Sequence, residues 1–212
     1  LLGMARTESA YRPSCRCLDP RMIRPVIIIG SGGHAKVVIE ALRCSGIPIL
    51  GHTDAEIAKE SLDLAGVPYL GSDEALNGHD PNTILLANGI GSTGDPATRI
   101  RAFKRLHDRG FQFTRIIHPS TVIASDADLG EGVQIMAGAI IQPGCRIGIN
   151  AIVNTGAHID HDCDIGEHVH VAPGAVLCGE VTIGTRCHIG AGAVIIQKGT
   201  RVAGVPARNI GT

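Results

Sequence analysis

Hydrophobic residues recur at every sixth position through the second half of the chain. Steps of six from Ile117 to Ile195 reach fourteen positions, and each is Ile, Leu or Val. The fifth position of each hexad from 121 to 193 holds a small residue (Ala, Cys, Thr or Val), and Gly is frequent at the second and fourth positions. A fixed short period with glycine at the turns is typical of a hexapeptide β-helix and matches no α-helix. We therefore predict an all-β parallel β-helix over 116–197.

The hexad also predicts which side chains stack in columns. Neighbouring side chains on a strand point to opposite faces, so positions five and one face inward and position six faces outward. With three hexads to a triangular coil, residues 18 apart in sequence stack at about 4.8 Å. Cys145 should therefore lie under Cys163 inside the coil, and His170 under His188 on its outer surface.

The amino-terminal half has a different pattern, in which apolar runs alternate with helical segments. Pro25–Gly30 is predicted to be a buried strand, a glycine-rich turn follows, and Lys36–Arg43 has a helical pattern. This order is the first unit of a doubly wound α/β fold. Further strands are expected near Ile47–Gly51 and Thr83–Ala87, and helices over Ser72–Leu76, which Val67–Gly71 precedes, and over Pro96–Arg109. The predicted organisation is a disordered leader (1–21), an α/β half-Rossmann domain (22–115), the β-helix (116–197) and a carboxy-terminal tail (198–212).

Composition excludes several classes of function. The 212 residues carry a formal net charge of −1, so no broad basic field indicates nucleic acid or an anionic membrane. There are two Tyr, three Phe and no Trp, which disfavours base stacking. No apolar run is long enough to span a membrane, and no secretory signal pattern is present. The seven cysteines show no framework spacing, which predicts a reduced, cytoplasmic protein.

The glycine turn is a candidate phosphate site. Gly30-x-Gly32-x-x-Ala35 is similar to a dinucleotide fingerprint, whose glycines let a phosphate approach N–H groups at a helix N-terminus. The domain is too short for both halves of a dinucleotide fold, so a nucleotide diphosphate is favoured over NAD. Asp54 ends the second strand, where an acidic residue meets ribose or base. The alternative is a turn with a purely structural role. The predicted substrate-binding residues are Gly30, Gly32, Gly33, His34 and Asp54.

Histidines cluster on the β-helix. Five of them, His158, His161, His168, His170 and His188, fall within one stretch of 31 residues. His161 is flanked by two aspartates, and a carboxylate beside an imidazole fixes its tautomer and raises its basicity, as a general base requires. His170 lies half a coil further on, on a different side of the triangular coil. The two rings could therefore meet at an interface between chains, or within one chain if His161 lies at a corner and its ring tilts toward the adjacent edge. Solvated histidines and a zinc site are the alternatives.

The hexad array, the His161-Asp162-Cys163 run and the closing Gly204-Val205-Pro206-Ala207-Arg208 resemble the left-handed β-helix acyltransferases. Together with the amino-terminal Gly-Ser-Gly-Gly-His-Ala-Lys, they resemble the sialic acid O-acetyltransferase-like subfamily, over about residues 24–210. This subfamily includes bacterial N-acetyltransferases of nucleotide-linked 4-amino sugars. One departure follows Ile195. Members of the family add another coil or more before the Gly-x-Pro-Ala segment, whereas here Lys198-Gly-Thr follows almost at once, and that coil would line the distal groove for coenzyme A.

The resemblance implies roles for individual residues. His161 is the expected catalytic base, assisted by Asp162. His170 would lie at the acetyl-CoA thioester and Gly179 would offer a backbone N–H to its carbonyl. We also assign His188, which stacks on His170, to the coenzyme. The glycine turn and Asp54 would hold a uridine or guanosine diphosphate. The family forms homotrimers with acetyl-CoA bound between β-helices, and no metal is expected.

The predicted function is acetyl-CoA-dependent N-acetylation of a 4-amino group on a nucleotide-activated sugar, in surface polysaccharide or glycan synthesis. O-acetylation of a sialic-acid-like sugar is a second possibility in the same class. A γ-class carbonic anhydrase shares the β-helix but requires a zinc histidine five residues before His161, where Gly156 stands. A non-catalytic scaffold is the remaining alternative. The sequence leaves open the sugar, the nucleotide base and the choice between N- and O-transfer.

Overall fold

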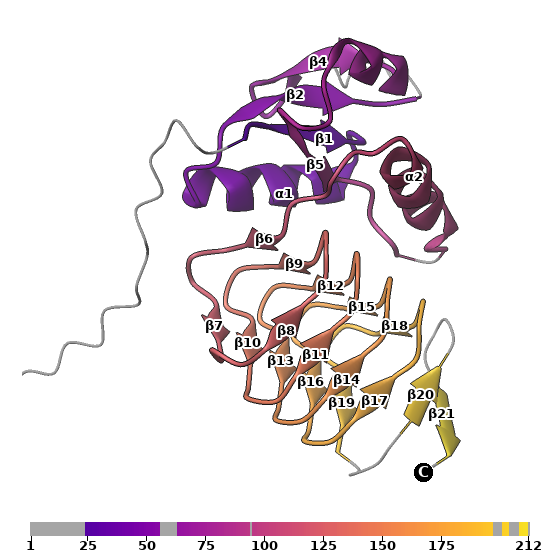
Figure 1. The fold of residues 1–212 in the computed structure, drawn as a ribbon. Coiled ribbons are helices and arrows are strands. Elements are labelled where there is room, and N and C mark those ends of the chain that lie inside the picture. The colour runs from indigo at the N-terminus through magenta and orange to yellow at the C-terminus, as the bar shows by residue number, and fades with distance from the viewer. Residues whose placement is uncertain (1–23, 56–62, 94, 197–200, 204–207, 212) are drawn as a thin grey trace, which may run out of the picture.

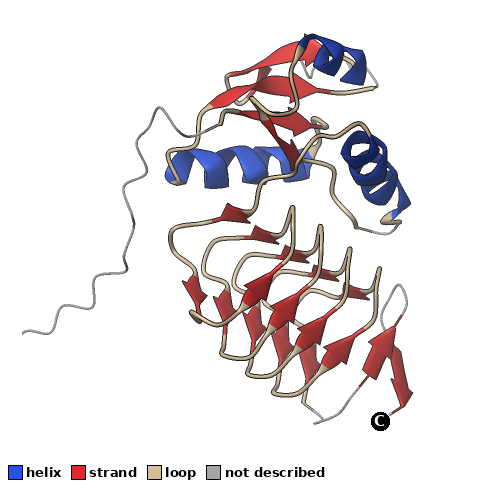
Figure 2. Cartoon of the chain, in the orientation of Figure 1, coloured by secondary structure: helices blue, strands red, loops and turns tan. Residues whose placement is uncertain are grey.

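The structure is a computed structural model that describes residues 24–55, 63–93, 95–196, 201–203 and 208–211. The predicted leader at 1–21 and the Gly-Val-Pro-Ala segment at 204–207 lie outside the described residues. The described chain forms an α/β domain seated on one side of a β-helix (Figure 1). All of the described helices belong to the α/β domain, as Figure 2 shows.

The α/β domain is built on a five-stranded sheet in the order β3-β4-β2-β1-β5. Strand β1 lies between β2 and β5 and is parallel to both, which confirms the expected βα unit. One feature was not expected. The short strand β3 pairs antiparallel with β4. In addition, the helix expected over Ser72–Leu76 is a 3₁₀ helix, η3. The elements are β1 Val26–Ile29, α1 Gly33–Cys44, β2 Ile49–Thr53, β3 Asp63–Leu64, β4 Val67–Gly71, η3 Asp73–Gly78, β5 Leu85–Asn88 and α2 Ala97–Asp108.

The β-helix consists of two-residue strands stacked in three parallel sheets. The domain-facing sheet contains β6 Ile116–Ile117, β9 Gln134–Ile135, β12 Ile152–Val153, β15 His170–Val171 and β18 His188–Ile189. The apolar sheet contains β7 Val122–Ile123, β10 Ile140–Ile141, β13 His158–Ile159, β16 Val176–Leu177 and β19 Val194–Ile195. The charged sheet contains β8 Asp128–Leu129, β11 Arg146–Ile147, β14 Asp164–Ile165, β17 Thr182–Ile183, β20 Arg201–Ala203 and β21 Arg208–Gly211.

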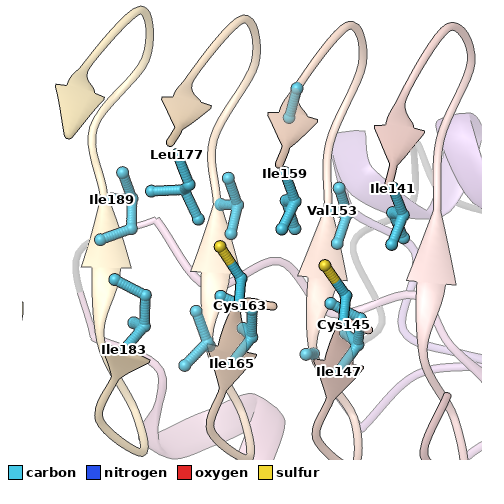
Figure 3. Packing of buried hydrophobic residues seen from close by; sticks show 14 of the residues in the cluster. Ile141, Cys145, Ile147, Val153, Ile159, Cys163, Ile165, Leu177, Ile183 and Ile189 are labelled. Carbon is cyan, nitrogen blue, oxygen red and sulfur yellow. The ribbon is translucent and has the colours of Figure 1, made fainter. Parts of the chain in front are cut away.

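The interior confirms the predicted register. Aliphatic first positions and small fifth positions form one buried cluster along the coil axis, with Cys145 beneath Cys163 (Figure 3). His170 pairs with His188 on the domain-facing sheet, as the 18-residue offset requires. The fourth hexad position has a left-handed backbone, with φ of +57° at Asp162 and +74° at Gly144. Glycine adopts this conformation without steric cost, which explains its frequency there.

Each sheet presents a different outer surface. The domain-facing sheet is covered by the α/β domain, and its outward residues Ile116, Gln134 and Ile152 are buried. The charged sheet is lined by polar side chains, including an ion pair between Arg146 and Asp164 of 2.6 Å. The apolar sheet is uncovered in the single chain, and Val122 and Val194 at its two ends are 61% and 60% exposed.

The last described strands complete one more coil on the charged sheet. Thr182 of β17 pairs with Arg201 of β20, which is 19 residues further on, after β18 and β19 have taken their places on the other two sheets. β21 then turns back antiparallel to β20. The domain-facing and apolar sheets therefore end at β18 and β19 within the described chain.

Candidate active site

His161 and Asp162 form an ordered pair at a corner of the β-helix. They lie in the turn between β13 of the apolar sheet and β14 of the charged sheet. His161 Nδ1 lies 2.8 Å from Asp162 Oδ2, and the backbone N–H of His161 donates to Asp160 Oδ1 at 2.9 Å. The hydrogen bond to Asp162 is the main cause that raises the pKa of His161, and the charges of Asp160, Asp162 and Glu180 act in the same direction. The other ring nitrogen, Nε2, has no hydrogen bond among the described residues and lies against the backbone of Gly179.

Two glycines in the neighbouring coils make room for this pair. A Cβ on Gly179 would stand 2.6 Å from both Cε1 and Nε2 of His161, so only glycine fits beneath the ring. A Cβ on Gly144 would collide with Asp162 Oδ1. Among the hydrogen bonds of the described residues, none uses the Gly179 N–H. Both glycines lie 18 residues from the side chain that they accommodate, so the stacking rule could have identified them from the sequence.

A shallow cavity of about 270 Å³ lies beside this corner on the apolar sheet. It is lined by Ile140, His158, Asp160, Val176 and Cys178, among others. Its walls are apolar on the sheet and polar toward the corner, where Asp160 precedes His161. This is the nearest described hollow to the His161 ring that could accept a small acyl group and part of its carrier.

A larger cavity of about 700 Å³ lies at the carboxyl ends of the parallel strands in the α/β domain. It opens between the loops that follow β1 and β5, the point where the strand order reverses and where α/β sheets bind ligands. The predicted residues Gly30, Gly32, Gly33, His34 and Asp54 all line it. A Cβ on Gly32 or Gly33 would meet nothing within 4 Å, so the space in front of the α1 N-terminus is open.

Asp54 and His34 also make structural contacts. The Ser31 N–H donates to Asp54 Oδ2 at 2.8 Å, and the Ser31 hydroxyl makes a second, short bond to the same oxygen. Asp54 therefore shapes the glycine turn as well as lining the cavity. His34 Nε2 donates to Gln134 Oε1 of the β-helix at 2.7 Å, and burial is the main cause that lowers the pKa of His34 to about 4.

His170 is separated from His161 within one chain. It lies on the domain-facing sheet, opposite the corner that carries His161, and is 5% exposed. The amide oxygen of Asn154 accepts the Thr155 N–H, so its NH₂ group donates to His170 Nε2 at 3.0 Å. In the neutral ring the proton is then on Nδ1 and donates to Ser92 Oγ at 2.9 Å. Burial is the main cause that lowers the pKa of His170 to about 3.

Within one chain, His161 and His170 therefore do not converge, and a shared site at an interface between chains stays a prediction. His188 stacks edge-on against His170, with the ring centroids 4.8 Å apart. The contact of these two histidines with acetyl-CoA stays a prediction.

A buried polar seam between the domains was not predicted from the sequence. Arg99 of α2 is 1% exposed and donates to the backbone oxygens of Asn88, Ile90 and Asn150. Asn88 in turn accepts at its backbone oxygen from Gln134 Nε2 at 2.7 Å. The signal in the sequence was slight, because an arginine in an amphipathic helix is usually exposed. The seam holds the loop after β5 against the β-helix and so fixes one wall of the larger cavity.

The comparisons with known proteins agree with this architecture. The PglD N-terminal domain family matches residues 25–106, and the bacterial transferase hexapeptide family (six repeats) matches residues 162–197. A histidine-to-asparagine mutant of perosamine N-acetyltransferase from Caulobacter crescentus, solved with CoA and GDP-perosamine, is 36% identical with a TM-score of 0.71. That match covers 89% of this chain and 97% of the other.

The acetyltransferase domain of PglB from Neisseria gonorrhoeae FA1090 is 30% identical with a TM-score of 0.71, and the match covers 88% of this chain and 100% of that one. The same domain has also been solved in complex with acetyl coenzyme A. The chain has no significant match among curated protein sequences.

The fold and the two sites define an acyltransferase of the left-handed β-helix class, which confirms the predicted fold and reaction class. The chain belongs to the hexapeptide-repeat acetyltransferases that carry a PglD-like amino-terminal domain. In the described part of the chain, no three His, Cys, Asp or Glu side chains are grouped to hold a metal ion. None of the described helices has the length and apolar character needed to cross a membrane.

Proposed function

We propose that this protein transfers the acetyl group of acetyl-CoA to the 4-amino group of a sugar linked to a nucleotide. The observation that carries the proposal is the coexistence of two sites in one chain. One is the His161–Asp162 pair packed on Gly179, and the other is the glycine-lined cavity at the carboxyl ends of the parallel strands. GDP-perosamine in the similar Caulobacter crescentus enzyme is a substrate of the proposed kind.

The chemistry follows from the geometry at His161. The sugar nitrogen attacks the thioester carbonyl carbon, and His161 Nε2 accepts a proton from the nitrogen as the new C–N bond forms. Asp162 holds Nδ1–H and stabilises the imidazolium. The Gly179 N–H would donate to the oxyanion, a contribution worth roughly 3–4 kcal/mol in other enzymes. The C–S bond then breaks, and the proton on His161 passes to the coenzyme A thiolate. No acyl-enzyme is required.

We propose that the working form is a homotrimer in the cytoplasm. The apolar sheet supports this arrangement, since four of its five outward residues, Val122, Ile140, Val176 and Val194, are aliphatic and at least partly exposed, with the exposed His158 between Ile140 and Val176. An exposed apolar strip of this kind marks an interface. His161 lies at the edge of this strip, so a neighbouring chain packed there would enclose it. In the described part of the chain, Cys44, Cys145, Cys163 and Cys178 form no disulfide, in keeping with a reducing compartment.

The positions of the two sites also favour a shared active centre. Within one chain, the nucleotide cavity lies on the α/β domain, which covers the domain-facing sheet, whereas His161 lies at the opposite corner. A sugar held in one chain would therefore meet the base of a neighbouring chain. In this arrangement acetyl-CoA binds between adjacent β-helices, along the cavity beside His161.

The test is a direct assay of acetyl transfer. The purified protein is incubated with acetyl-CoA and either GDP- or UDP-linked 4-amino sugars, and product is followed by thiol release and mass spectrometry. We expect acetylation of the amine, with a loss of about 10²–10⁴ in kcat for His161→Asn. His118→Asn is the matched control, because His118 is bonded only to Ser120 in the described chain. Acetylation of a hydroxyl instead, or no loss in His161→Asn, would contradict the proposal.

A further inference from the structure

A further cavity, of about 340 Å³, lies where the start of α2 meets the β-helix. On the β-helix side its wall is the turn between β17 and β18, which carries Arg186 at the corner of the charged and domain-facing sheets. On the α2 side Asp95, Arg101 and Lys104 line it, among others. His161 lies at a different corner, between the apolar and charged sheets, so this cavity is separate from the surface that we propose for acetyl-CoA. We call it the basic cavity.

Three cations and one carboxylate line the basic cavity, a formal excess of two positive charges in a chain whose net charge is −1. Arg101 donates to the neutral Thr98 Oγ1 at 3.0 Å, and its side chain also lines the glycine-lined cavity. Lys104 and Arg186 line only the basic cavity of these two, and their side chains make no hydrogen bond or ion pair with any described residue. The carboxylate is that of Asp95, which accepts the first backbone N–H of α2 at 2.8 Å.

The positive charge of this cluster also acts on the seam between the domains. Burial is the main cause that lowers the pKa of His168 to about 4, and the charges of Lys104 and Arg186 lower it further. Glu167 acts on His168 in the opposite direction, but it is not part of the lining of the basic cavity. The acids beside the cluster are thus Asp95 and Glu167, and within the described chain neither forms an ion pair with Lys104 or Arg186.

Arg186 is held in an uncommon backbone conformation. Its φ is +64°, in the left-handed region, which glycine adopts without steric cost and which is unfavourable for a residue with a Cβ. Gly192, at the same position of the next hexad, has a φ of +66°. The repeat therefore accepts glycine here, and the arginine is present in spite of the steric cost. Residues kept in such a conformation are concentrated at functional sites, which favours a role for the Arg186 side chain.

We propose that the basic cavity is a binding site for a phosphate group, either inorganic phosphate or the phosphate of a small monoester. Arg186 would donate paired N–H groups to the phosphate oxygens, and Lys104 would supply a second charge from the opposite wall. A phosphate monoester carries a charge of about −1.5 to −2 at pH 7, which would offset the excess positive charge of the lining. Ile100 gives the cavity an apolar wall for the organic part of an ester. The inference does not depend on acetyl transfer.

The site is tested by ³¹P NMR titration of the whole protein with inorganic phosphate and with glucose 1-phosphate, at pH 7 and constant ionic strength. For Lys104→Gln and Arg186→Gln we expect the Kd of phosphate to rise about tenfold or more, as for loss of a charged hydrogen bond. Arg115→Gln is the matched control, because it removes one charge from an exposed side chain outside the basic and the glycine-lined cavities. Gly32→Val should leave the Kd of phosphate unchanged, because Gly32 lines the other cavity.

Thermal unfolding gives an independent measurement. Without phosphate, the Tm of Arg186→Gln should equal or exceed that of the wild type, because the substitution removes repulsion between like charges. With phosphate, the wild type should gain more in Tm than the variant, because a ligand that binds only the folded state stabilises it. A gain in Tm that is the same in both proteins would contradict the assignment of Arg186 to the site.

The two probes distinguish the sources of the phosphate. A lower Kd for glucose 1-phosphate than for inorganic phosphate supports an organic ligand, and equal values support free phosphate. A wild-type protein that does not bind phosphate overturns the proposal, as does a Kd that is the same in the wild type, Lys104→Gln and Arg186→Gln. Loss of phosphate binding in Gly32→Val would place the phosphate in the glycine-lined cavity and would also overturn it.

Discussion

The imidazole of His161 lies directly on the backbone of Gly179, one coil further along the β-helix. A methyl group at Gly179 would be 2.6 Å from both Cε1 and Nε2 of the ring. The proposed base and the proposed oxyanion donor are therefore in contact before any substrate binds. This packing fixes the distance between the base and the Gly179 N–H without any hydrogen bond between them.

Gly179→Ala is expected to displace the His161 ring and to lower kcat by about 10- to 100-fold, since misplacement of a catalytic group by about 1 Å has effects of this size. The fold should survive, because His161 is exposed and can rotate away. The measurement is steady-state kinetics together with thermal unfolding. Gly190→Ala is the matched control, because a Cβ there meets nothing within 4 Å. An unchanged kcat in Gly179→Ala would show that the packing of His161 on Gly179 does not contribute to catalysis.

Asp162→Asn should shift the acidic limb of the kcat–pH profile to lower pH. The bond to Asp162 raises the pKa of His161, and the base is active only in its neutral form, so activity in the wild type is lost as pH falls through that raised pKa. With Asn the pKa falls, and neutral imidazole persists at lower pH. The plateau value of kcat should decrease, because the tautomer is no longer held. If the acidic limb of the kcat–pH profile does not move in Asp162→Asn, the group that titrates there is the substrate amine or another residue, and not His161.

Mixed oligomers test whether the active centre is shared. His161→Ala removes the base, and Gly32→Val blocks the nucleotide side without disturbing the empty turn, since a Cβ at Gly32 contacts nothing. Each variant alone should be inactive. If each active centre combines the nucleotide cavity of one chain with the base of its neighbour, a 1:1 mixture should restore about a quarter of wild-type activity. About half of the chains carry an intact cavity and about half carry an intact base, and random assembly combines them independently. If both halves come from one chain, mixing restores nothing.

Val176→Asp should disperse the trimer, because it places a charge in the middle of the aliphatic strip of the apolar sheet. Thr182→Asp is the matched control, since Thr182 is the outward residue of the next strand, on the charged sheet. Light scattering gives the mass of each variant, and the assay above gives its activity. A trimer that persists in Val176→Asp with unchanged stability would place the interface on another surface.

The seam between the domains should make the protein sensitive to acid. Burial is the main cause that lowers the pKa values of His34 and His168 to about 4 and of His170 to about 3, so these groups are neutral in the folded state and charge on unfolding. Their contribution to stability is complete above the unfolded pKa of about 6.5 and is lost as pH falls toward the folded values. A fully buried histidine of this kind loses on the order of 1–2 kcal/mol between pH 7 and 5.

The measurement is Tm at pH 7 and pH 5 for the wild type and His170→Gln, at constant ionic strength. The variant should be less stable than the wild type at pH 7, but its Tm should fall less on acidification. The buried cation Arg99 opposes protonation of all three histidines, because it lowers the pKa of each. An equal fall in Tm for both proteins would show that His170 contributes nothing to acid sensitivity.

The six-residue repeat in the sequence was sufficient to predict the β-helix and its register. Because every coil repeats the same six-residue geometry, a column of side chains in space is a fixed offset in sequence, and Ile117 to Ile195 predict the core without any long-range information. The same regularity places Gly179 over His161 and Gly144 under Asp162. The βα unit around Gly30 could also be predicted from a short stretch of sequence, since its strand, turn and helix are consecutive. The short strand β3 was missed because two residues are too few to form a pattern.

The contact between the two domains could not be predicted from the sequence and is visible only in the folded structure. The hexad predicts that His170 faces outward, but not that Ser92 of the other domain covers it and lowers its pKa by burial. Nor does any local pattern show that Arg99 is buried among backbone oxygens, or that Arg101, two positions on, faces the nucleotide cavity. Such features depend on the orientation of α2 against a sheet and a β-helix that are distant in sequence. That orientation follows from the packing of the whole interface, and no repeat in the chain encodes it.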